Sequence, residues 1–494
     1  ESRAVPALSQ AAEQVSANIG RRIAAAPAAA ILAIAALAAA QPLDADLWVH
    51  LNNGRFIASR GELPYPDPFT FSAGDAVWTV HEWLPALIIF QLVDLGGVIA
   101  AVLGIAAVYA LIWGLLERTL AAHGVGPWMR TAALVTASLP LFPFAGIRPL
   151  PFGLLAAVLA AALALHHRRT GSRWIWLLPL VFVIWGNVHA SFPVGFAVLG
   201  ALLFEALWAR SRLPFIGPRP RTRFAPFAAV TALSVVAPAL NPSGLRLLAQ
   251  PFFQWGGEFR RFNSDWRPPE VFSETWWFFA AFLVLLGLLL ILRRARIEPA
   301  MLGLLILVLA AGLSTRKVMP FAAVLAPLLM AYPLAAVSAA RLPLPPWMVR
   351  AGAVLAVAAA IGAAAAVSPR TLDGPSAVPM PTAARDLVAD TGATRIFGTY
   401  HWGAFLTWAL WPDARVFIDG RFDLFVPDAL GDYLSVTGLE PGWRQKLMDI
   451  DPDAVVIQTD SPLARRLAQP GSGWRDIGGD SIARVLLPDR ARSA

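Results

Sequence analysis

The chain has 494 residues, of which 57% are hydrophobic and only 15% are charged; it has no cysteine and a formal net charge of +8. A soluble protein carries about a quarter charged residues, so this composition excludes an ordinary soluble globular protein. The lack of cysteine excludes disulfides, thiol nucleophiles and thiolate metal sites. The positive charge is mostly arginine placed at the ends of apolar runs, which indicates membrane topology and lipid-headgroup contact and gives no sign of a nucleic-acid partner.

Apolar runs of roughly 17 to 25 residues recur along the chain, which predicts a polytopic α-helical membrane protein with about eleven transmembrane helices. The predicted spans are 23–43, 97–116, 129–147, 150–166, 174–188, 190–208, 224–240, 275–292, 299–314, 318–337 and 350–367. Arg21 and Arg22 precede the first run, so the positive-inside rule places the N-terminus in the cytoplasm and, after eleven spans, the C-terminus outside. A cleaved signal peptide ending near Ala40 is the alternative for the first run. The division between the fifth and sixth spans is the least marked.

Two predicted outer loops, 44–95 and 241–274, are too long to be simple connections, and each contains an amphipathic stretch suited to the membrane surface. These stretches are 82–93 and 245–253. Beyond residue 368, prolines mark a linker and short β-rich runs then alternate with helical ones. Strands are predicted at 395–400, 415–419, 454–458 and 482–487, and helices at 383–390, 403–410, 428–436 and 462–468. The sequence therefore predicts a transmembrane domain at 1–367 and a C-terminal extracytoplasmic α/β domain at 368–494.

A polar motif follows the first span directly, where Asp44 and Asp46 stand two residues apart and His50 follows. Carboxylates at a membrane exit are costly unless they face water, a metal or a substrate, so we expect these two to face a site. His81 and Glu82 close the same loop at the bilayer surface. Asp67 lies in a proline-rich turn, where a capping carboxylate in water is the simpler interpretation.

An acidic motif in the first outer loop, just after the first helix, resembles the GT-C superfamily of membrane glycosyltransferases, which use polyprenyl-phosphate-linked sugars. The predicted layout also resembles that superfamily, with a cytoplasmic N-terminus, a large first outer loop and a C-terminal extracytoplasmic domain. The stretches 185–189, 241–244 and 417–421 further resemble a group of bacterial GT-C-like proteins. Two signatures are absent: Asp-x-Asp replaces the Asp-Glu pair of mannosyl- and aminoarabinosyltransferases, and there is no Trp-Trp-Asp-Tyr-Gly motif of oligosaccharyltransferases. The resemblance therefore implies a sugar transferase without identifying the sugar or the acceptor.

Transfer from a lipid phosphate needs a carboxylate to take the proton of the acceptor hydroxyl, and positive charge to stabilise the departing phosphate. The hypothesis is that Asp44 or Asp46 is the base, with Asp46 slightly less favoured. Seven cations on the predicted outer face break the positive-inside pattern and either bind the phosphate or contact lipid headgroups: Arg148, Arg246, Arg260, Arg261, Arg267, Arg316 and Lys317. Further candidate substrate-binding residues are His50, His81, Glu82 and His189, the last of which has a helix-end hydrogen bond as its simpler interpretation. Asp44, Asp46 and His50 are also candidate ligands for divalent Mg or Mn.

In the C-terminal domain, the run from Asp419 to Asp423 follows a predicted strand, where α/β domains place ligand contacts; a strand-ending turn with a local Arg–Asp pair is the alternative. The run 400–403 offers aromatic rings that either stack on a sugar acceptor or dock on the bilayer.

The resemblance implies an inverting glycosyltransferase at the outer leaflet of a bacterial inner membrane, with a periplasmic C-terminal domain. Its partners would be a polyprenyl-phosphate-linked sugar donor, a glycan, lipid or protein acceptor, and the bilayer. A lipid or polysaccharide transporter, a polysaccharide ligase that depends on outer arginines, and a non-catalytic envelope-assembly scaffold are the alternatives. The two halves do not match in hydropathy and the acids lie in loops, which disfavours a transporter.

Overall fold

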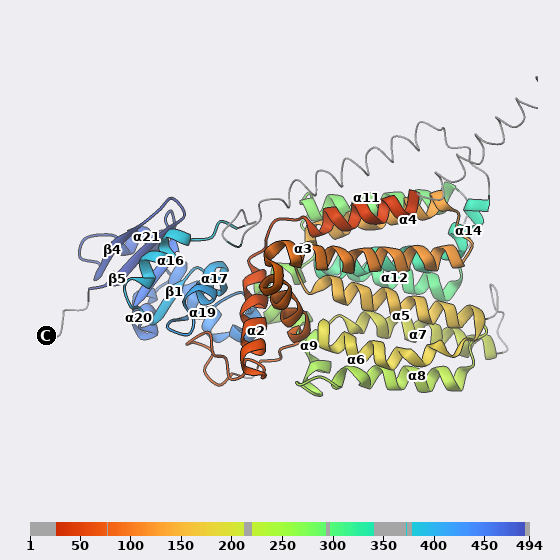
Figure 1. Ribbon diagram of the computed structural model, residues 1–494, viewed down its shortest axis with the longest axis horizontal. Coiled ribbons are helices and arrows are strands. Elements are labelled where there is room, and N and C mark those ends of the chain that lie inside the picture. The colour runs from red at the N-terminus through yellow and green to blue at the C-terminus, as the bar shows by residue number, and fades with distance from the viewer. Residues whose placement is uncertain are drawn as a thin grey trace, which may run out of the picture.

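The computed structural model describes residues 26–76, 78–211, 220–292, 297–339, 372 and 378–489. A bundle of roughly parallel helix axes forms one part of the molecule and a small α/β domain sits at one end of it (Figure 1). The bundle helices are Ala26–Ala39, α3 Trp83–Ala122, α4 Pro127–Ser138, α5 Leu150–Thr170, α6 Leu178–Val188, α7 Phe192–Arg210, α8 Phe224–Val236, α11 Glu274–Leu292, α12 Pro299–Ser314, α13 Met319–Leu329 and α14 Ala331–Ala339.

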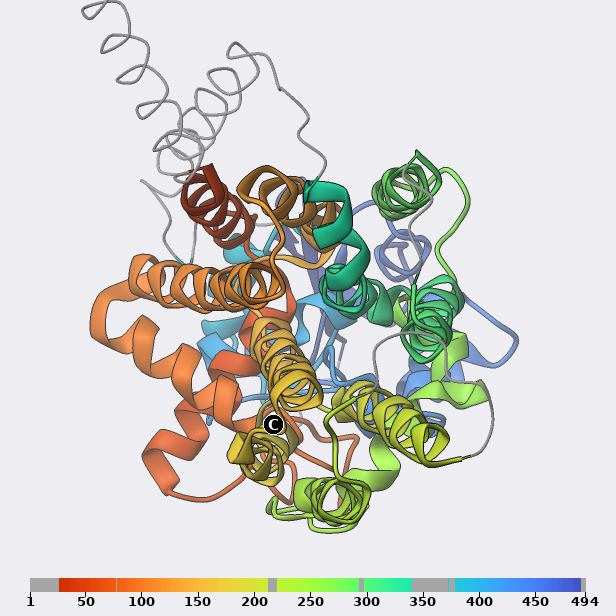
Figure 2. The ribbon, with the colours of Figure 1, turned by 90° about the vertical axis from the view of Figure 1, so that its right-hand side faces the viewer.

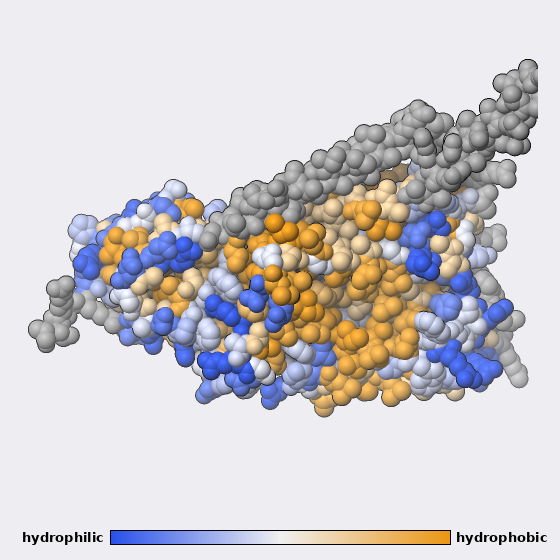
Figure 3. Space-filling model, in the orientation of Figure 1, coloured by the Kyte–Doolittle hydropathy of each residue, from blue (hydrophilic) through white to orange (hydrophobic). Residues whose placement is uncertain are grey.

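Within the described residues, three helices are long and apolar enough to cross a membrane alone, namely α3, α5 and α7. A fourth span is formed if Arg316–Leu329 and Ala331–Ser338, bent by 53°, count as one. The ten predicted spans between 23 and 337 coincide with helical segments, several of them short, and the eleventh, 350–367, lies outside the described residues. The surface of the bundle carries a broad apolar band flanked by polar ends (Figure 3). An apolar surface of this extent indicates an integral membrane protein, while the number of about eleven spans stays a prediction.

The centre of the bundle is α5, which packs against α3, α6, α7 and α13, and the helices are seen end-on around it in Figure 2. Buried alanines recur along α5, including Ala157, Ala160, Ala161 and Ala164. Small side chains let neighbouring helix backbones approach closely, which is how helices pack in a membrane, where lipid is as apolar as leucine. The fifth and sixth predicted spans are separated at 189–191, between α6 and α7.

A buried cluster of charged residues joins helices at the end of the bundle away from the α/β domain, the end predicted to face the cytoplasm. Arg168 of α5 donates to both carboxylate oxygens of Glu205 on α7, each at 2.6 Å, and lies 3.0 Å from Glu298, just before α12. One guanidinium thus joins three helices, since its planar fork serves two carboxylates at once.

The first outer loop is largely helical. Its helix α2, Asp46–Arg60, crosses the end of the bundle between the bundle and the α/β domain (Figure 1). The predicted amphipathic stretch 82–93 is the first part of α3, which departs from helical geometry at Gly96 and Gly97 before the membrane-spanning part begins. The second loop contains α9, Arg246–Trp255, over most of its predicted amphipathic stretch, and the short α10, Gly257–Phe262.

Gly54 is where α2 meets α3 most closely. A Cβ atom at Gly54 would lie 2.3 Å from the Ala86 carbonyl oxygen and 2.4 Å from the Phe90 Cβ. We expect Gly54→Ala to destabilise the protein by about 1–3 kcal/mol, because backbone atoms must move to admit the methyl group. Thermal unfolding in detergent measures the effect. Gly114→Ala is the matched control, since its Cβ meets nothing within 4 Å, and an equal loss in both variants would contradict the prediction.

The α/β domain contains one five-stranded sheet of order β2-β1-β3-β5-β4. Strands β2, β1 and β3 are parallel and β3, β5 and β4 are antiparallel. The strands are β1 Arg395–Gly398, β2 Arg415–Val416, β3 Ala454–Gln458, β4 Trp474–Gly479 and β5 Ala483–Pro488. The helices are α16 Thr382–Ala389, α17 Tyr400–Leu410, α18 Phe422–Phe425, α19 Asp428–Thr437, α20 Trp443–Ile450 and α21 Pro462–Leu467.

The four predicted strands are confirmed, with corrections at their ends. Residue 400 belongs to α17 and not to a strand, and 417–419 lie beyond the end of β2, although the Phe417 N–H still donates to the Ile396 carbonyl at 2.8 Å. Strand β4 was not predicted, because its residues are largely solvent-exposed and it ends in two glycines, so it lacks an apolar alternation. Helix α20 was missed for a similar reason, since Leu447 is its one buried residue.

The edge of this sheet is completed by the first outer loop. Thr70 forms a parallel bridge to Val416, with hydrogen bonds from Phe71 N to the Val416 carbonyl (3.1 Å) and from Val416 N to the Phe69 carbonyl (3.2 Å). Strand β2 lies at the edge of the sheet, where backbone amides and carbonyls would otherwise be unpaired. The bridge from the first loop pairs part of this edge. A division of the sequence at 367/368 therefore leaves part of the sheet in the transmembrane half.

Candidate functional site

A cavity of about 470 Å³ lies where the bundle, both outer loops and the α/β domain meet. Three parts of the chain surround it: the first loop, the outer ends of the bundle helices with the second loop, and the α/β domain. Among its lining residues are Asp44, Asp46, His50, His81, Glu82, Arg148, His189, Asp265, Arg316, Lys317, Tyr400, His401, Gly420, Arg421 and Asp423. Segments far apart in the sequence thus contribute charged groups to one enclosed space.

Nine predicted site residues line this cavity, and four arginines of the second loop do not: Arg246, Arg260, Arg261 and Arg267. Arg246 is exposed at the start of α9. Arg260 donates to the Ser314 carbonyl at 2.6 Å, and Arg267 donates to the carbonyls of Arg260 and Arg261. These arginines therefore hold the second loop together or lie at its surface, outside the cavity.

Both carboxylate oxygens of Asp44 have a polar partner. One oxygen accepts the Asp46 backbone N–H at 2.8 Å, and the other forms an ion pair with Arg148, at the start of α5. The pairing joins the segment between the first helix and α2 to the residues just before α5, next to the cavity. A carboxylate fixed in this way is a poor proton acceptor, because the bound guanidinium stabilises its charged form.

Asp46 differs from Asp44 in having a free carboxylate. Within the described part of the chain, no hydrogen bond or ion pair involves its side-chain oxygens. Asp46 borders the cavity, and desolvation by the protein around it raises the pKa of its carboxyl to about 6. Within that balance the charge of Lys317 lowers the pKa, and the charges of Asp265, Glu82 and Asp419 raise it. A carboxylate with a raised pKa and no partner, open to a cavity, has the properties of a general base.

Glu82 stands among three histidines. His189 Nε2 lies 3.5 Å and His81 Nε2 3.8 Å from its Oε1, and His50 lines the same wall with its buried Nδ1 unpartnered among the described residues. Burial lowers the pKa of His189 to about 3 and lowers that of His50, so both are neutral at pH 7. Burial raises the pKa of Glu82, but Lys317 and the three histidines in their protonated forms lower it to about 2. Glu82 is therefore ionised at pH 7, with two imidazoles within 4 Å of its carboxylate.

His189 also has the helix-end role that its position predicts. It follows α6, and its Nδ1 accepts the Ser191 backbone N–H at 3.1 Å. No group of three or more His, Cys, Asp or Glu side chains in the described ranges is arranged to hold a metal ion. Asp44, which pairs with Arg148, is accordingly not grouped with Asp46 and His50 as a set of metal ligands.

Cations lie at the membrane side of the cavity. Arg316 and Lys317 form the turn between α12 and α13; Arg316 approaches Thr275 Oγ1 at 3.4 Å, and Lys317 Nζ lies 3.9 Å from Asp265. Arg148 is near enough to both Arg316 and Asp265 to be affected by their charges. Two apolar residues, Phe144 and Phe321, line the cavity beside these cations. The combination of positive charge and apolar lining suits an amphiphilic phosphate.

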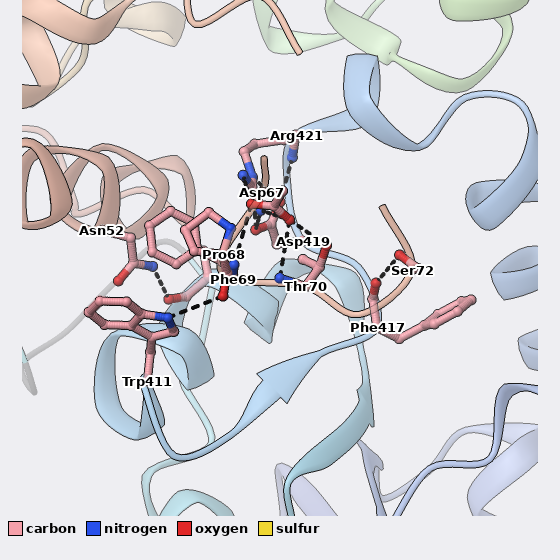
Figure 4. Close-up of polar contacts among 11 residues, drawn as sticks. Asn52, Asp67, Pro68, Phe69, Thr70, Ser72, Trp411, Phe417, Asp419 and Arg421 are labelled. Carbon is pink, nitrogen blue, oxygen red and sulfur yellow. Dashed lines mark hydrogen bonds and ion pairs between the residues drawn. The ribbon is translucent and has the colours of Figure 1, made fainter. Parts of the chain in front are cut away.

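The α/β domain forms the opposite wall through the run 419–423. Arg421 is buried between two carboxylates, at 2.7 Å from Asp67 and 2.8 Å from Asp419 (Figure 4). The local Arg–Asp pair that the sequence offered as the alternative is thus present, between Arg421 and Asp419. The interpretation of Asp67 as a carboxylate in water is wrong, because its side chain is buried and paired with a residue of the other domain. Asp423 accepts a hydrogen bond from Gln250 of α9 at 3.0 Å, which joins the second loop to the same wall.

Asp265 and Gln250 were not identified from the sequence. Asp265 stands in the second loop among arginines and aromatic residues, which gave no reason to single out one acid. Gln250 lies on the inward face of an amphipathic helix, where a polar residue is the signal that could have identified it.

Two solved structures resemble this chain along most of its length. The archaeal oligosaccharyltransferase AglB from Archaeoglobus fulgidus, in complex with an inhibitory peptide and a dolichol-phosphate, aligns with a TM-score of 0.52 and 12% identity, over 89% of this chain and 69% of that one. ArnT from Cupriavidus metallidurans, bound to undecaprenyl phosphate, aligns with a TM-score of 0.51 and 14% identity, over 97% of this chain and 99% of that one. No family model and no curated protein sequence matches the chain. Because both solved proteins belong to the GT-C superfamily, the expected resemblance is confirmed at the level of structure, and the chain has the GT-C fold.

Proposed function

We propose that this protein is a membrane glycosyltransferase that moves a sugar from a polyprenyl-phosphate donor to an extracytoplasmic glycan, lipid or protein acceptor. The observation that carries the proposal is the position of Asp46: an unpaired carboxylate between cations on the membrane side and the α/β domain on the other. The two solved proteins of like fold, each bound to a polyprenyl phosphate, support the donor class.

In this proposal, Arg148, Arg316 and Lys317 bind the donor phosphate. They lie at the ends of bundle helices, where a lipid phosphate enters from the bilayer surface, and apolar residues such as Phe321 line the same side. Arginine can bind two phosphate oxygens with its planar fork and lysine acts as a point charge. Positive charge here stabilises the negative charge that the phosphate gains as it leaves.

Asp46 is the proposed base, which reverses the order that the sequence favoured. Asp44 is held by Arg148, whereas Asp46 is free and has a raised pKa. The acceptor hydroxyl gives its proton to the Asp46 carboxylate while its oxygen forms a bond to the anomeric carbon. The bond from that carbon to the phosphate oxygen breaks on the opposite face, and its electron pair stays on the polyprenyl phosphate, so the configuration inverts.

The raised pKa of Asp46 predicts how the rate of sugar transfer depends on pH. The base acts in its ionised form, so kcat/KM should rise with pH, reach half its maximum near pH 6 and level above it. A pH profile of sugar transfer between pH 4.5 and 8 checks this, with stability of the protein measured at each pH. A profile that is flat across this range would contradict the assignment of Asp46 as base.

The test of the function is transfer of radiolabelled sugar from a panel of polyprenyl-phosphate-sugars, using purified protein and membrane extracts as the acceptor source. Turnover that depends on Asp46 supports the proposal. Donor binding without turnover for any member of the panel would overturn it and favour a carrier or a scaffold. Accessibility of tags at the two ends, in intact cells and in opened vesicles, tests the proposed bacterial inner-membrane location with a cytoplasmic N-terminus and a periplasmic α/β domain.

A further inference from the structure

The turn between β2 and α18 lies next to Asp46. A Cβ atom placed on Gly420 would lie 3.4 Å from Asp46 Oδ1 and 3.6 Å from Val49 Cγ2, which is ordinary van der Waals contact. Gly420 has no side chain, so its place in the cavity wall leaves room over the Asp46 carboxylate. Gly420 is therefore a point at which the α/β domain borders the proposed base, and Tyr400 and Asp419 of the same domain are near enough to be affected by its charge.

The turn is held by an ion-pair cluster that joins it to the first loop. Arg421 exposes 3% of its side chain and Asp67 exposes 1%. The Arg421 guanidinium contacts both Asp67 oxygens and both Asp419 oxygens (Figure 4). It also lies over the face of Trp78, 4.8 Å from the ring centroid. One cation lies between two buried carboxylates, so each partner fixes the others.

Two further contacts fix the same segment. Ser72 of the first loop donates to the Phe417 carbonyl, two residues before Asp419. On the other side, a Cβ on Gly403 of α17 would lie 2.2 Å from the Ile418 carbonyl oxygen. The backbones of α17 and of this segment are therefore packed so closely that no side chain fits between them. Asn52 of α2 donates to the Ala404 carbonyl at 2.8 Å, which ties α17 to the helix that bears Asp46. The turn and Asp46 are thus held by one connected set of contacts.

We propose that the turn 419–421 is the acceptor-side wall of the site, and that Gly420 leaves the passage by which an acceptor hydroxyl reaches Asp46. Arg421 is a positioning residue that acts through this turn, with Asp67 as its anchor. The inference rests on the proposed function, and it predicts that the passage admits a large acceptor because residue 420 has no side chain.

The first test compares Gly420→Ala with Gly431→Ala, whose Cβ meets nothing within 4 Å. Sugar released to water and sugar transferred to the acceptor extract are measured in the same reaction. Water is small enough to pass an added methyl group, so Gly420→Ala should lower the ratio of acceptor transfer to hydrolysis by about tenfold or more, whereas the control leaves it unchanged. Thermal stabilisation by undecaprenyl phosphate should be the same in both variants.

Positioning by Asp67 is tested with Asp67→Asn, which leaves the Arg421–Asp419 pair intact and so should preserve folding. We expect it to lower the same ratio, and Asp67→Glu to restore part of it. A purely structural role would reduce transfer and hydrolysis in equal proportion, and would overturn the positioning role.

A second test does not depend on activity. Because the chain has no cysteine, Val49→Cys with Gly420→Cys introduces a single pair, and mild oxidation should link it, seen as a reductant-sensitive shift in gel mobility. The pair Val49→Cys and Gly431→Cys should not link. Failure of the first pair to link would overturn the geometry.

The outcomes separate the two proposals. If the wild-type protein uses no donor, the proposed function fails and this inference fails with it. If the wild-type protein transfers sugar and Gly420→Ala keeps the wild-type ratio, only this inference is overturned.

Discussion

Asp46→Asn is expected to lower kcat for sugar transfer by about 10²- to 10⁴-fold, which is the usual contribution of a general base. Asparagine keeps the size of the side chain and can still accept a hydrogen bond, but it cannot take the proton of the acceptor hydroxyl. Undecaprenyl phosphate should still stabilise the variant against heat, because the proposed phosphate-binding cations are unchanged. Initial rates of radiolabelled sugar transfer at pH 7.5 give the fold-change.

Asp44→Asn is the matched comparison, two residues away in the same motif. It removes the partner of Arg148, so we expect weaker or altered donor binding and a smaller fall in kcat. Full activity in Asp46→Asn, or a collapse in Asp44→Asn alone, would assign the base to Asp44 or to another group.

Arg421→Gln is expected to lower the stability of the protein by about 3–5 kcal/mol. The substitution leaves the carboxylates of Asp67 and Asp419 buried without their cation, and removing one partner of a buried ion pair has a cost of this size. The change is measured as a lower midpoint of thermal unfolding in detergent, followed by tryptophan fluorescence.

Arg444→Gln serves as the control, because Arg444 lies exposed on α20 of the same domain. Asp67→Asn should cost less than Arg421→Gln, since one carboxylate and one guanidinium remain paired. If Arg421→Gln and Arg444→Gln have the same midpoint of thermal unfolding, the ion-pair cluster does not make the expected contribution to stability.

The membrane architecture was predictable because it follows from local chemistry. Apolar runs of sufficient length identify the helices, and period and composition identify most strands of the soluble domain. The first-loop motif at Asp44 and Asp46 was also visible, because acids directly after an apolar span are unexpected. The sequence could not show which of the two acids is the better base. That depends on which of them pairs with Arg148, which lies 104 residues after Asp44.

Long-range pairs account for the other differences. Asp67 and Arg421 are 354 residues apart, and each has a sufficient local explanation on its own, as a turn cap and as a partner of Asp419. The same limit applies to Arg246, Arg260 and Arg261. The positive-inside rule places them on the outer face, but it gives no information on whether a side chain points into a cavity, toward a loop carbonyl or into water.

The strand bridge between Thr70 and Val416 has a consequence for how the protein is made. In the proposed topology, the first loop reaches the outer side long before β2 is synthesised, so residues around Thr70 wait without a partner while the remaining spans are inserted. An unpaired strand is prone to associate with other chains, and contacts this distant in sequence form late. Export chaperones would therefore be most needed during this interval. A chain that terminates early would lose more than its last domain, because the loop that carries Asp46 would have nothing to fold against.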